Sequence, residues 1–515
     1  RHATIGTSIG CTVRPTELML LPGGLPMTAL FAHRPIDRRT FLRKAVGGAA
    51  ALAAPSLLAG CGGGSAASYQ ADAAPWRRYA GTTLNFISEN TSPTAAIAAN
   101  KKPFTDLTGI NLNIVQLELS ALVQKVALDF ASGSAAYQVI YADPYQVLAP
   151  YAKGLYDLRG LMGDANLPQP KPGLSDFIPT QLDAAGRFID KEAVYALPYD
   201  CPTLIWQYRA DLFAKHKDAM SNDLGFDPTP SGDRTWEEYY RIAAWFNKKA
   251  HADVPFGAGH QAKQHDSLMN DFSNVLWAYG GDYFEHGTVV GRLGSRDPGP
   301  SQLTTDAAME AAGFYRKLLK VAHPSSTTWD WDGLGSALRA GQIAMCPNWH
   351  EYAASNETAL PGKIDYAPLP KGPARRAGMY GGTGLGINAN CSRREREAAW
   401  LFLVWATAPK TQLANLASKA GGGTPTRQSV YDLPEVHRAE RRPSKLPNIL
   451  TAPAVFETWK PQNIGLRPKI PMWNECDTII FTQLSDMLVA GTSPRATLVA
   501  AKVQLDRTVA RGWAT

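Results

Sequence analysis

Glu89, Glu118 and Asp143 stand at the ends of three short runs rich in β-branched and apolar residues. The runs are Thr83–Ser88, Asn111–Glu118 and Tyr137–Asp143. Such runs predict strands, and ligands of parallel α/β sheets bind beyond the carboxyl ends of the strands. These three carboxylates and the neighbouring Asn90 are therefore candidates for contact with a small molecule.

Catalytic and cofactor motifs are missing from the sequence. It has no GxxxxGK[ST], HExxH, GxSxG or GxGxxG pattern, and the glycines of Gly381–Gly386 do not have dinucleotide-loop spacing. His260, His265 and Asp266 are close in sequence, but a separation of five puts the two histidines on different faces of a helix. We expect neither a cofactor nor a metal.

A glycoside hydrolase is the main enzymatic alternative. Hydrolysis of this kind needs two carboxylates about 5–10 Å apart. Asp143, Asp200 and Glu351 are acids that would have to supply them, and the sequence singles out no pair. We predict a protein that is not an enzyme.

Helical patterns separate the predicted strands. Ala95–Thr108 follows the first strand, and Ala121–Ala131 follows the second, with Ser120 placed to cap it. Strands that alternate with helices indicate parallel βαβ units. The fold class that we predict is α/β.

Further helices are predicted along the rest of the chain. Thr235 and Glu238 have the spacing of a capping box, which would open an amphipathic helix. The other helical patterns are Ser267–Ala278, Thr305–Val321, Gly333–Ala340, a segment from about Arg393, Cys476–Val489 and Ser493–Val509. This number of elements favours two α/β lobes crossed by more than one connection.

The N-terminal region has the pattern of a signal peptide. A charged segment, DRRTFLRK from Asp37, precedes an apolar run at Ala45–Ala59 and then Leu58-Ala59-Gly60-Cys61. The run is shorter than the roughly 20 apolar residues that span a bilayer. Residues 1–60 are therefore predicted to be a leader and signal peptide, with no membrane-spanning segment after it.

Two details of this region resemble known export signals. Arg38-Arg39-Thr40-Phe41-Leu42 resembles the twin-arginine motif, although Asp37 stands where Ser or Thr is usual. Leu58-Ala59-Gly60-Cys61 resembles the lipobox of bacterial lipoproteins, in which Cys61 would be acylated. Residues 61–80, rich in Gly and Ala, would then be a flexible tether. This implies a periplasmic protein anchored to a membrane by lipid.

Charge and cysteine content narrow the range of partners. Residues 1–60 carry a net charge of +5, so that the rest of the chain carries only +2. A nearly neutral body gives no basic surface for nucleic acid, and we predict no nucleic-acid partner. Cys201, Cys346, Cys391 and Cys476 lack metal-binding spacing, and their pairing is left open between free thiols and disulfides.

A series of segments resembles family 1 extracellular solute-binding proteins, the group that includes the maltose-binding proteins. Each segment is weak alone, but their order along the chain from about Thr82 to Ala510 makes the resemblance specific. The segments are Ala196–Tyr199 with Leu204–Phe213, Thr235–Glu238, Trp277–Phe284, Ala340–Met345 with Asn348-Trp349, Tyr366–Gly372, and Gly381–Asn388 with Glu397–Trp400. Arg209 departs from the family, where Asn is common.

The resemblance implies a two-lobe periplasmic-binding-protein type II fold with a ligand cleft between the lobes. By this analogy, the first lobe holds residues 81–200 and 380–430, and the second lobe holds residues 201–379 and 431–515. The lobes would close around a bound ligand, and the membrane subunits of the importer would recognise the closed form.

The resemblance also implies which residues hold the ligand. Sugar sites combine aromatic faces with carboxylates that accept hydrogen bonds from hydroxyl groups. The predicted ligand contacts are Glu89, Asp143, Tyr199, Asp200, Trp277, Trp349, Gly382, Thr383 and Arg427.

The implied function is capture of a sugar or sugar alcohol by the substrate-binding subunit of an ABC importer. Its partners would be a carbohydrate ligand and the permease subunits in the inner membrane, and the protein itself would be a monomer. A carbohydrate-active hydrolase and a binding protein that serves a sensory receptor are the alternatives.

Overall fold

The structure, a computed structural model, describes residues 73–285, 287–437 and 446–512, all of which belong to one compact unit. The predicted signal peptide and Cys61 lie outside the described residues. Part of the predicted tether is helical, at α1 (Ala73–Arg77), and Trp76 and Tyr79 are buried in a core. Within the described part of the chain, no helix is long and apolar enough to cross a membrane.

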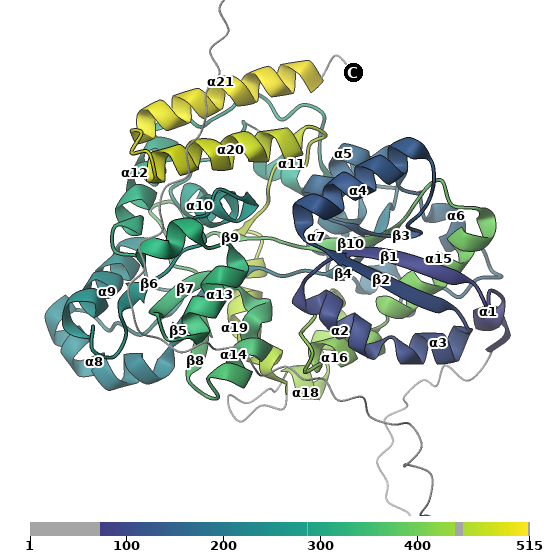
Figure 1. The fold of residues 1–515 in the computed structure, drawn as a ribbon, viewed down its shortest axis with the longest axis horizontal. Coiled ribbons are helices and arrows are strands. Elements are labelled where there is room, and N and C mark those ends of the chain that lie inside the picture. The colour runs from purple at the N-terminus through teal and green to yellow at the C-terminus, as the bar shows by residue number, and fades with distance from the viewer. Residues whose placement is uncertain (1–72, 286, 438–445, 513–515) are drawn as a thin grey trace, which may run out of the picture. The chain divides into compact units, whose positions relative to one another are not determined.

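Five strands form the first sheet, in the order β2-β1-β3-β10-β4 (Figure 1). They are β1 (Thr83–Glu89), β2 (Asn111–Leu117), β3 (Val139–Ala142), β4 (Ala196–Asp200) and β10 (Thr383–Ile387). β1 pairs in parallel with β2 and β3, which confirms the parallel units predicted at the start of the chain. β10 is antiparallel to β3 and β4, and its two glycines hide its strand pattern in the sequence.

Four strands form the second sheet, in the order β6-β7-β5-β8. They are β5 (Leu204–Arg209), β6 (Phe256–Ala258), β7 (Ile343–Trp349) and β8 (Ile364–Ala367). Every residue of β7 is buried, as is expected of a central strand covered on both faces. We call the part of the molecule around the first sheet the first lobe, and the part around the second sheet the second lobe.

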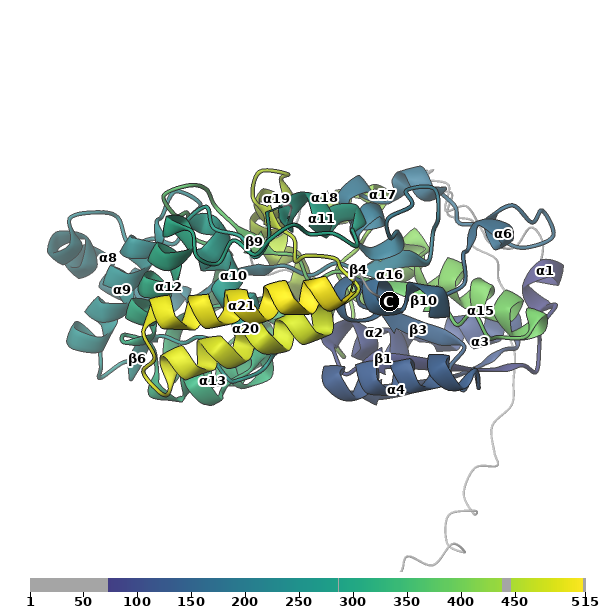
Figure 2. The same ribbon diagram turned by 90° about the horizontal axis from the view of Figure 1, so that it is seen from above.

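Helices surround both sheets (Figures 1 and 2). In chain order after α1 they are α2 (Ser92–Asn100), α3 (Lys102–Thr108), α4 (Leu119–Ser132), α5 (Ala149–Tyr151), α6 (Arg159–Met162), α7 (Pro179–Gln181), α8 (Ala210–Leu224), α9 (Trp236–Lys249), α10 (Asp266–Ala278), α11 (Gly287–Leu293), α12 (Asp306–Leu319), α13 (Trp331–Arg339), α14 (Ala353–Ala359), α15 (Arg393–Ala406), α16 (Pro409–Leu416), α17 (Gln428–Tyr431), α18 (Pro434–His437), α19 (Ala452–Trp459), α20 (Trp473–Leu488) and α21 (Pro494–Gly512). The last two lie side by side in Figure 2.

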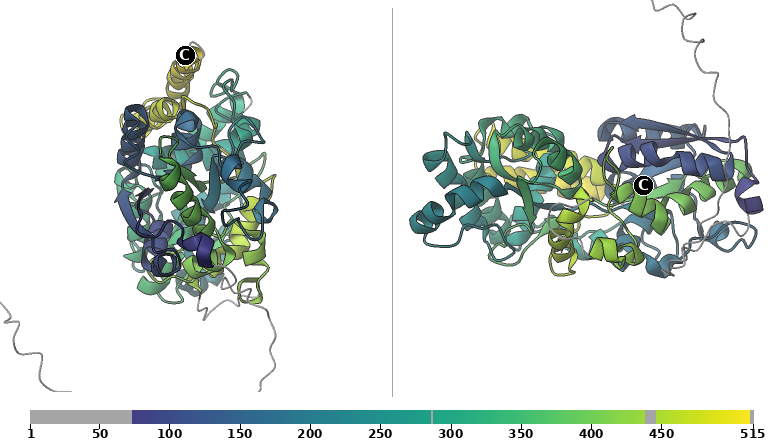
Figure 3. Two further views of the ribbon diagram at one scale, coloured as in Figure 1. Left: turned by 90° about the vertical axis from the view of Figure 1, so that its right-hand side faces the viewer. Right: turned by 90° about the horizontal axis from the view of Figure 1, so that it is seen from below.

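Segments far apart in sequence combine to build each lobe. The purple strands β1 and β2 lie close to the green helices α15 and α16 (Figure 3), and α15 packs against β1 while α16 packs against α2. Buried side chains of α15, such as Trp400 and Phe402, complete the core of the first lobe. Trp206, Trp236 and Trp473 belong to a separate core in the second lobe.

The local signals at helix starts had mixed outcomes. The capping box of Thr235 and Glu238 is confirmed at the start of α9. The cap predicted at Ser120 is wrong, because the carboxylate of Glu118 caps α4 and accepts the backbone N–H of Ser120. The single helix predicted over 95–108 is two helices, since a new helix begins just before Pro103, whose ring disfavours a helix interior.

Two segments that run between the sheets touch each other. Residues 201–203 join β4 to β5, and Thr203 forms a bridge with Tyr380, which precedes β10. Next to this bridge, β9 (Gly378–Met379) pairs in parallel with β11 (Ile464–Gly465). The strands of the first sheet all fall within 81–200 and 380–430, although the exact lobe boundaries stay a prediction.

Candidate ligand-binding site

A cavity of about 90 Å³ lies where strand ends of both sheets meet. Glu89 ends β1, Asp143 follows β3 and Trp349 ends β7. The cavity is lined by Glu89, Asn90, Thr91, Ser92, Leu119, Tyr141, Asp143, Pro202, Asp266, Asn270, Trp331, Asp332, Trp349, Glu351, Tyr352, Gly381 and Arg467. Both lobes therefore supply its walls.

A second hollow, of about 310 Å³, lies on the first lobe alone. Its lining includes Pro103, Leu107 and Trp405, and Lys410 is its one charged residue among those described. A mostly apolar hollow without convergent polar groups offers little to a hydroxylated ligand. The cavity between the lobes is the better candidate for a binding site.

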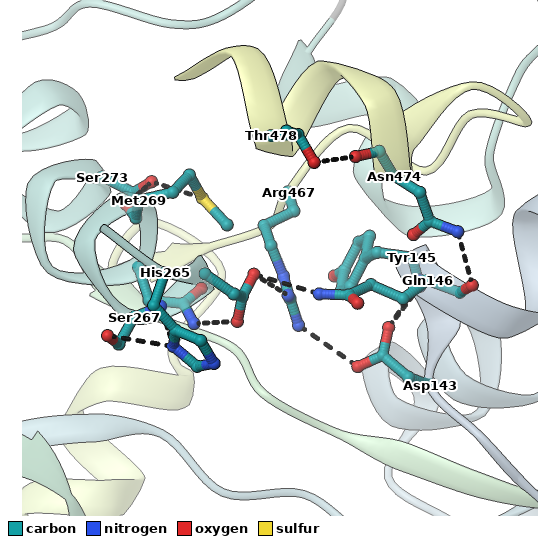
Figure 4. Close-up of polar contacts among 12 residues, drawn as sticks. Asp143, Tyr145, Gln146, His265, Ser267, Met269, Ser273, Arg467, Asn474 and Thr478 are labelled. Carbon is teal, nitrogen blue, oxygen red and sulfur yellow. Dashed lines mark hydrogen bonds and ion pairs between the residues drawn. The ribbon is translucent and has the colours of Figure 1, made fainter. Parts of the chain in front are cut away.

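Asp143 is held by the turn of chain that follows β3. One carboxylate oxygen accepts the backbone N–H groups of Tyr145 (2.8 Å) and Gln146 (2.7 Å). The other oxygen lies 3.4 Å from a terminal guanidinium nitrogen of Arg467 (Figure 4). Burial raises the pKa of Asp143, while Arg467 and the two backbone N–H groups act to lower it.

Arg467 connects the first lobe to the N-terminus of α10. Its other terminal nitrogen lies 3.6 Å from Asp266, and its guanidinium group stacks 4.2 Å from the ring centre of Tyr145. Asp266 also accepts hydrogen bonds from Gln146 (3.1 Å) and Asn270 (2.7 Å). These contacts form a buried junction between the lobes, which we call the arginine junction (Figure 4).

A second polar junction lies beside the crossing segments. Glu351, just after β7, donates a hydrogen bond to Asp200 at the end of β4, and Asp200 also accepts the backbone N–H of Thr424. Burial raises the pKa of Asp200 to about 6 and that of Glu351 well above its usual range. Glu351 is thus a neutral acid at pH 7. We call this cluster the acid junction.

His350 completes the acid junction as a neutral imidazole. Its Nδ1 lies 3.2 Å from the backbone nitrogen and 3.3 Å from the carbonyl oxygen of Thr203, and its Nε2 lies 2.8 Å from the Thr424 hydroxyl. Burial lowers the pKa of His350 to about 4.

Glu89 faces the cavity next to other acids. Its pKa is raised to about 8, mainly by burial and also by the nearby charges of Asp143, Asp266 and Glu118, while a hydrogen bond from Tyr141 acts to lower it. At neutral pH a large part of Glu89 is therefore protonated.

Aromatic side chains supply the remaining walls. Trp349 is 9% exposed, and its ring lies against the backbone of Gly381, where a Cβ atom would come within 2.5 Å. Trp331 stacks edge-on with His265 at 4.8 Å, and the Tyr352 hydroxyl donates to Asp332 at 2.6 Å. Such faces suit the C–H surfaces of a sugar or polyol.

Three of the nine predicted ligand contacts line this cavity, namely Glu89, Asp143 and Trp349. Asp200 does not line the cavity but is hydrogen-bonded to Glu351, which does. Gly382 and Thr383 do not line it either, since the neighbouring Gly381 provides the backbone surface at this point.

The other predicted contacts belong to the interior of the lobes. Trp277 is 1% exposed and packs against the backbone of Gly465. The Tyr199 hydroxyl donates to the carbonyl of Pro93 at 2.9 Å. Arg427 is fully buried in the first lobe, where it pairs with Asp176 at 3.2 Å. Their pattern in the sequence reflects core packing and a local ion pair.

Several lining residues carried little or no signal in the sequence as ligand contacts. Arg467 lies in a loop between β11 and α20, without a motif around it. The sequence pointed to Asp266 only as a neighbour of His260 and His265 and gave no signal for Asn270, and both residues meet the strand ends only after α10 folds against the cleft. An acid directly before the predicted helix Ser267–Ala278, followed four residues later by Asn, was the available signal.

One arrangement that the sequence left open, a glycosidase with Asp200 and Glu351 as its acid pair, does not fit this geometry. No group of His, Cys, Asp and Glu in the described ranges has the arrangement of a metal site. Asp200 and Glu351 are in direct hydrogen-bond contact, which leaves no room for the substrate and water that a glycosidase places between its carboxylates. The four cysteines at 201, 346, 391 and 476 are buried free thiols.

Two curated proteins are similar to this chain over most of its length. A probable amino-acid ABC transporter periplasmic-binding protein of Sinorhizobium fredii is 25% identical over 386 residues, which covers 72% of this chain and 78% of that protein. An erythritol/L-threitol-binding protein of Mycolicibacterium smegmatis is 24% identical over 433 residues, with 78% and 83% covered.

Solved structures share the fold. A maltose-bound MalE3 of T. maritima superposes with a TM-score of 0.68 at 23% identity and covers 83% of this chain and 99% of its own. An ABC transporter solute-binding protein of Agrobacterium radiobacter K84 in complex with ribitol has the same TM-score and coverage at 22% identity. The predicted two-lobe periplasmic-binding-protein fold is therefore confirmed.

The model of the bacterial extracellular solute-binding protein family matches residues 88–413. This match spans most of both sheets and includes the strand ends that surround the cavity. The chain belongs to the family of bacterial extracellular solute-binding proteins.

Proposed function

We propose that this chain is the substrate-binding subunit of a bacterial ABC importer, and that it captures a sugar or sugar alcohol in the cavity between its lobes. The observation that carries the proposal is the composition of the cavity wall. Carboxylates at strand ends of the first lobe face tryptophan and tyrosine rings of the second lobe. This is the combination that a ligand with hydroxyl groups and apolar C–H faces requires.

The names of similar proteins support this class of ligand. One relative is described as binding erythritol and L-threitol, and two of the solved structures hold ribitol and D-mannitol. Another relative is described as a probable amino-acid transporter component. Amino acids are therefore the ligand class against which the proposal has to be tested.

The ligand contacts that we propose combine predicted and newly found residues. Three of these contacts were predicted from the sequence, namely Glu89, Asp143 and Trp349. Two are added from the structure, Asn270 and Glu351, because each has a buried oxygen without a hydrogen-bond partner. A bound polyol would donate hydroxyl hydrogen bonds to these oxygens, while Trp349 would cover its C–H face.

Capture would proceed by closure of the two lobes. We keep the proposed division into residues 81–200 with 380–430 and residues 201–379 with 431–515. Residues 201–203 and the segment that leads through β9 into β10 run between the sheets, touch each other, and are suited to act as a hinge. The permease subunits in the inner membrane would then recognise the closed form. Service to a sensory receptor in place of an importer is the remaining alternative.

Export and anchoring complete the proposed role. The twin-arginine segment around Arg38 and Arg39 would direct export, and acylation of Cys61 would hold a monomeric protein at a membrane facing the periplasm. The support for this step is the resemblance of the two sequence motifs. Metabolic labelling with a fatty acid in the native protein and in a Cys61→Ala variant would test it, and equal labelling would contradict it.

Calorimetric titration with ribitol, D-mannitol and maltose tests the site itself. We expect one ligand per chain, and a roughly tenfold or greater loss of affinity in Trp349→Ala, as for removal of one aromatic face. Trp329→Ala is a matched control, because Trp329 stacks on His323 and does not line the cavity. Equal affinity in both variants and the native protein would remove the cavity from the proposal.

A further inference from the structure

The cavity is rich in acids and holds one positive charge. The acidic residues among its described lining residues are Glu89, Asp143, Asp266, Asp332 and Glu351, and Arg467 is its single Lys or Arg. A site for an anionic ligand normally supplies a guanidinium or ammonium group that is free to pair with it. Whether Arg467 is free therefore decides which charge the ligand can have.

Both terminal nitrogens of Arg467 are already paired within the protein. Its side chain is 3% exposed, and its two terminal nitrogens lie 3.4 Å from Asp143 and 3.6 Å from Asp266. The ring of Tyr145 covers one face of the guanidinium group at 4.2 Å. Figure 4 shows the side chain of Arg467 between Asp143 and the group around His265 at the start of α10. Its charge is thus neutralised within the wall.

The buried polar atoms of the described wall that lack a partner are two acceptors, on Asn270 and Glu351, and one donor, the Nε of Arg467. Asn270 is 1% exposed, and its amide nitrogen donates to Asp266, so that its Oδ1 points elsewhere and has no partner. One oxygen of Glu351 is likewise buried and unpaired, while this side chain donates its proton to Asp200. Both atoms need a hydrogen-bond donor, such as a hydroxyl group, and would repel a carboxylate or phosphate oxygen.

We propose that the cavity selects ligands without negative charge, because Asp143 and Asp266 together withhold Arg467 from the ligand. A neutral polyol or sugar fits, whereas its oxidised acid or its phosphate ester is rejected. Asp266 is a specificity-determining residue in this scheme, since it sits beside both Arg467 and Asn270. This inference rests on the proposed function and adds the charge class of the ligand.

The direct test compares neutral compounds with their acids on the full chain. The pairs are ribitol with D-ribonate, D-mannitol with D-mannonate, and D-glucose with D-gluconate, each titrated by calorimetry at pH 7.5. Within any pair whose neutral member binds, we expect the acid to bind at least roughly 100-fold more weakly. An acid that binds as tightly as its neutral partner would overturn the inference and leave the proposed function standing.

Variants test the cause of the selectivity. Asp266→Asn keeps the shape of the side chain but frees Arg467 from one of its two carboxylates. We expect the ratio of the affinity for the neutral compound to the affinity for its acid to decrease by at least about tenfold. Asp143→Asn makes the same test from the first lobe. Glu237→Gln removes one negative charge at an exposed ion pair of the second lobe and should leave this ratio unchanged.

The outcomes separate the two proposals. If the ratio of the affinities for neutral compound and acid is unchanged in both Asp266→Asn and Asp143→Asn, pairing of Arg467 with these two residues does not cause the selectivity. If neither variant folds, the comparison of the three pairs on the native protein still decides the charge class. Binding of amino acids, with silence toward all neutral polyols and sugars, would refute the proposed function and this inference with it.

Discussion

The arginine junction and the acid junction both bury charge-bearing groups between the lobes, but they do so by different means. The arginine junction holds charged groups together, with Arg467 between Asp143 and Asp266, and one further buried acid, Asp477, is hydrogen-bonded to Asp266 with its pKa raised by burial. The acid junction contains no cation among its described groups. It avoids buried charge by protonation, with Glu351 as a neutral acid next to Asp200.

This difference teaches how each junction responds to change. An ion pair in a low-dielectric interior depends on both partners, and the loss of one leaves the other charge uncompensated. A protonated acid depends on the pH, because its stability contribution is linked to proton binding. The arginine junction should therefore be sensitive to mutation, and the acid junction to pH.

The largest effect is expected for Arg467→Met. The substitution keeps an unbranched side chain but leaves Asp143 and Asp266 without their cation, and we expect a loss of about 3–5 kcal/mol in the free energy of unfolding. Denaturant titration measures it. Arg292→Met is the matched control, since Arg292 also pairs with an aspartate, Asp183, but is half exposed. A loss of at most about 1 kcal/mol is expected there. Equal losses would break the comparison.

Glu89 provides the next effect, because it lies beside the arginine junction and is not paired with Arg467. Its pKa is raised from 4.5 to about 8, so that the folded state binds a proton more tightly than the unfolded state. Its contribution to stability is full below pH 4.5 and is lost as the pH rises to about 8. The free energy of unfolding of the native protein should therefore fall between pH 5 and 8. In Glu89→Gln we expect this fall to be smaller by about 1–4 kcal/mol, as measured by unfolding curves across this pH range. An unchanged pH profile in the variant would count against it.

The pKa of His350, the basic side chain of the acid junction, provides a further test. Its pKa is lowered from 6.5 to about 4, so that its contribution to stability is present above pH 6.5 and is lost as the pH falls toward 4. We expect this loss to be about 1–3 kcal/mol. Titration of the His350 ring by NMR provides the check, and a midpoint near 6.5 would show that the imidazole is not buried as described.

The smallest effect on stability is expected for Glu351→Gln. A neutral amide replaces an acid that is already neutral, so that unfolding at pH 7 should change by less than about 1 kcal/mol. The corresponding acid-to-amide substitution Asp143→Asn should lower the free energy of unfolding by more, because Asp143 pairs with Arg467. A large loss in Glu351→Gln would mean that Glu351 carries a charge, and the two junctions would then be alike.

The sequence predicted most of the fold because local patterns agree with it. The strands β1 and β2, the capping box of α9, and the last two helices all follow from periodicity and capping residues in short windows. The strand β10 was harder, since Gly384 and Gly386 give it little strand preference, and pairing with β3 and β4 decides its conformation.

The site was only partly predictable for a related reason. Acids that end strands, such as Glu89 and Asp143, can be located from the strand pattern alone. Arg467 and Asn270 reach the cavity through contacts between segments that are hundreds of residues apart or lie on a different lobe. Trp277 shows the converse, because a tryptophan in a core and one in a wall look the same in sequence.

A thermal-shift screen of the purified protein against neutral sugars, polyols, amino acids and peptides tests the central claim most directly. A ligand at 100 times its dissociation constant adds about 2.7 kcal/mol to the stability of the native state, a shift of several degrees or somewhat less for a chain of this size. The account predicts such a shift with one class of neutral polyol or sugar, and recovery of that compound unchanged. A shift with amino acids or peptides alone, or consumption of the sugar, would contradict it.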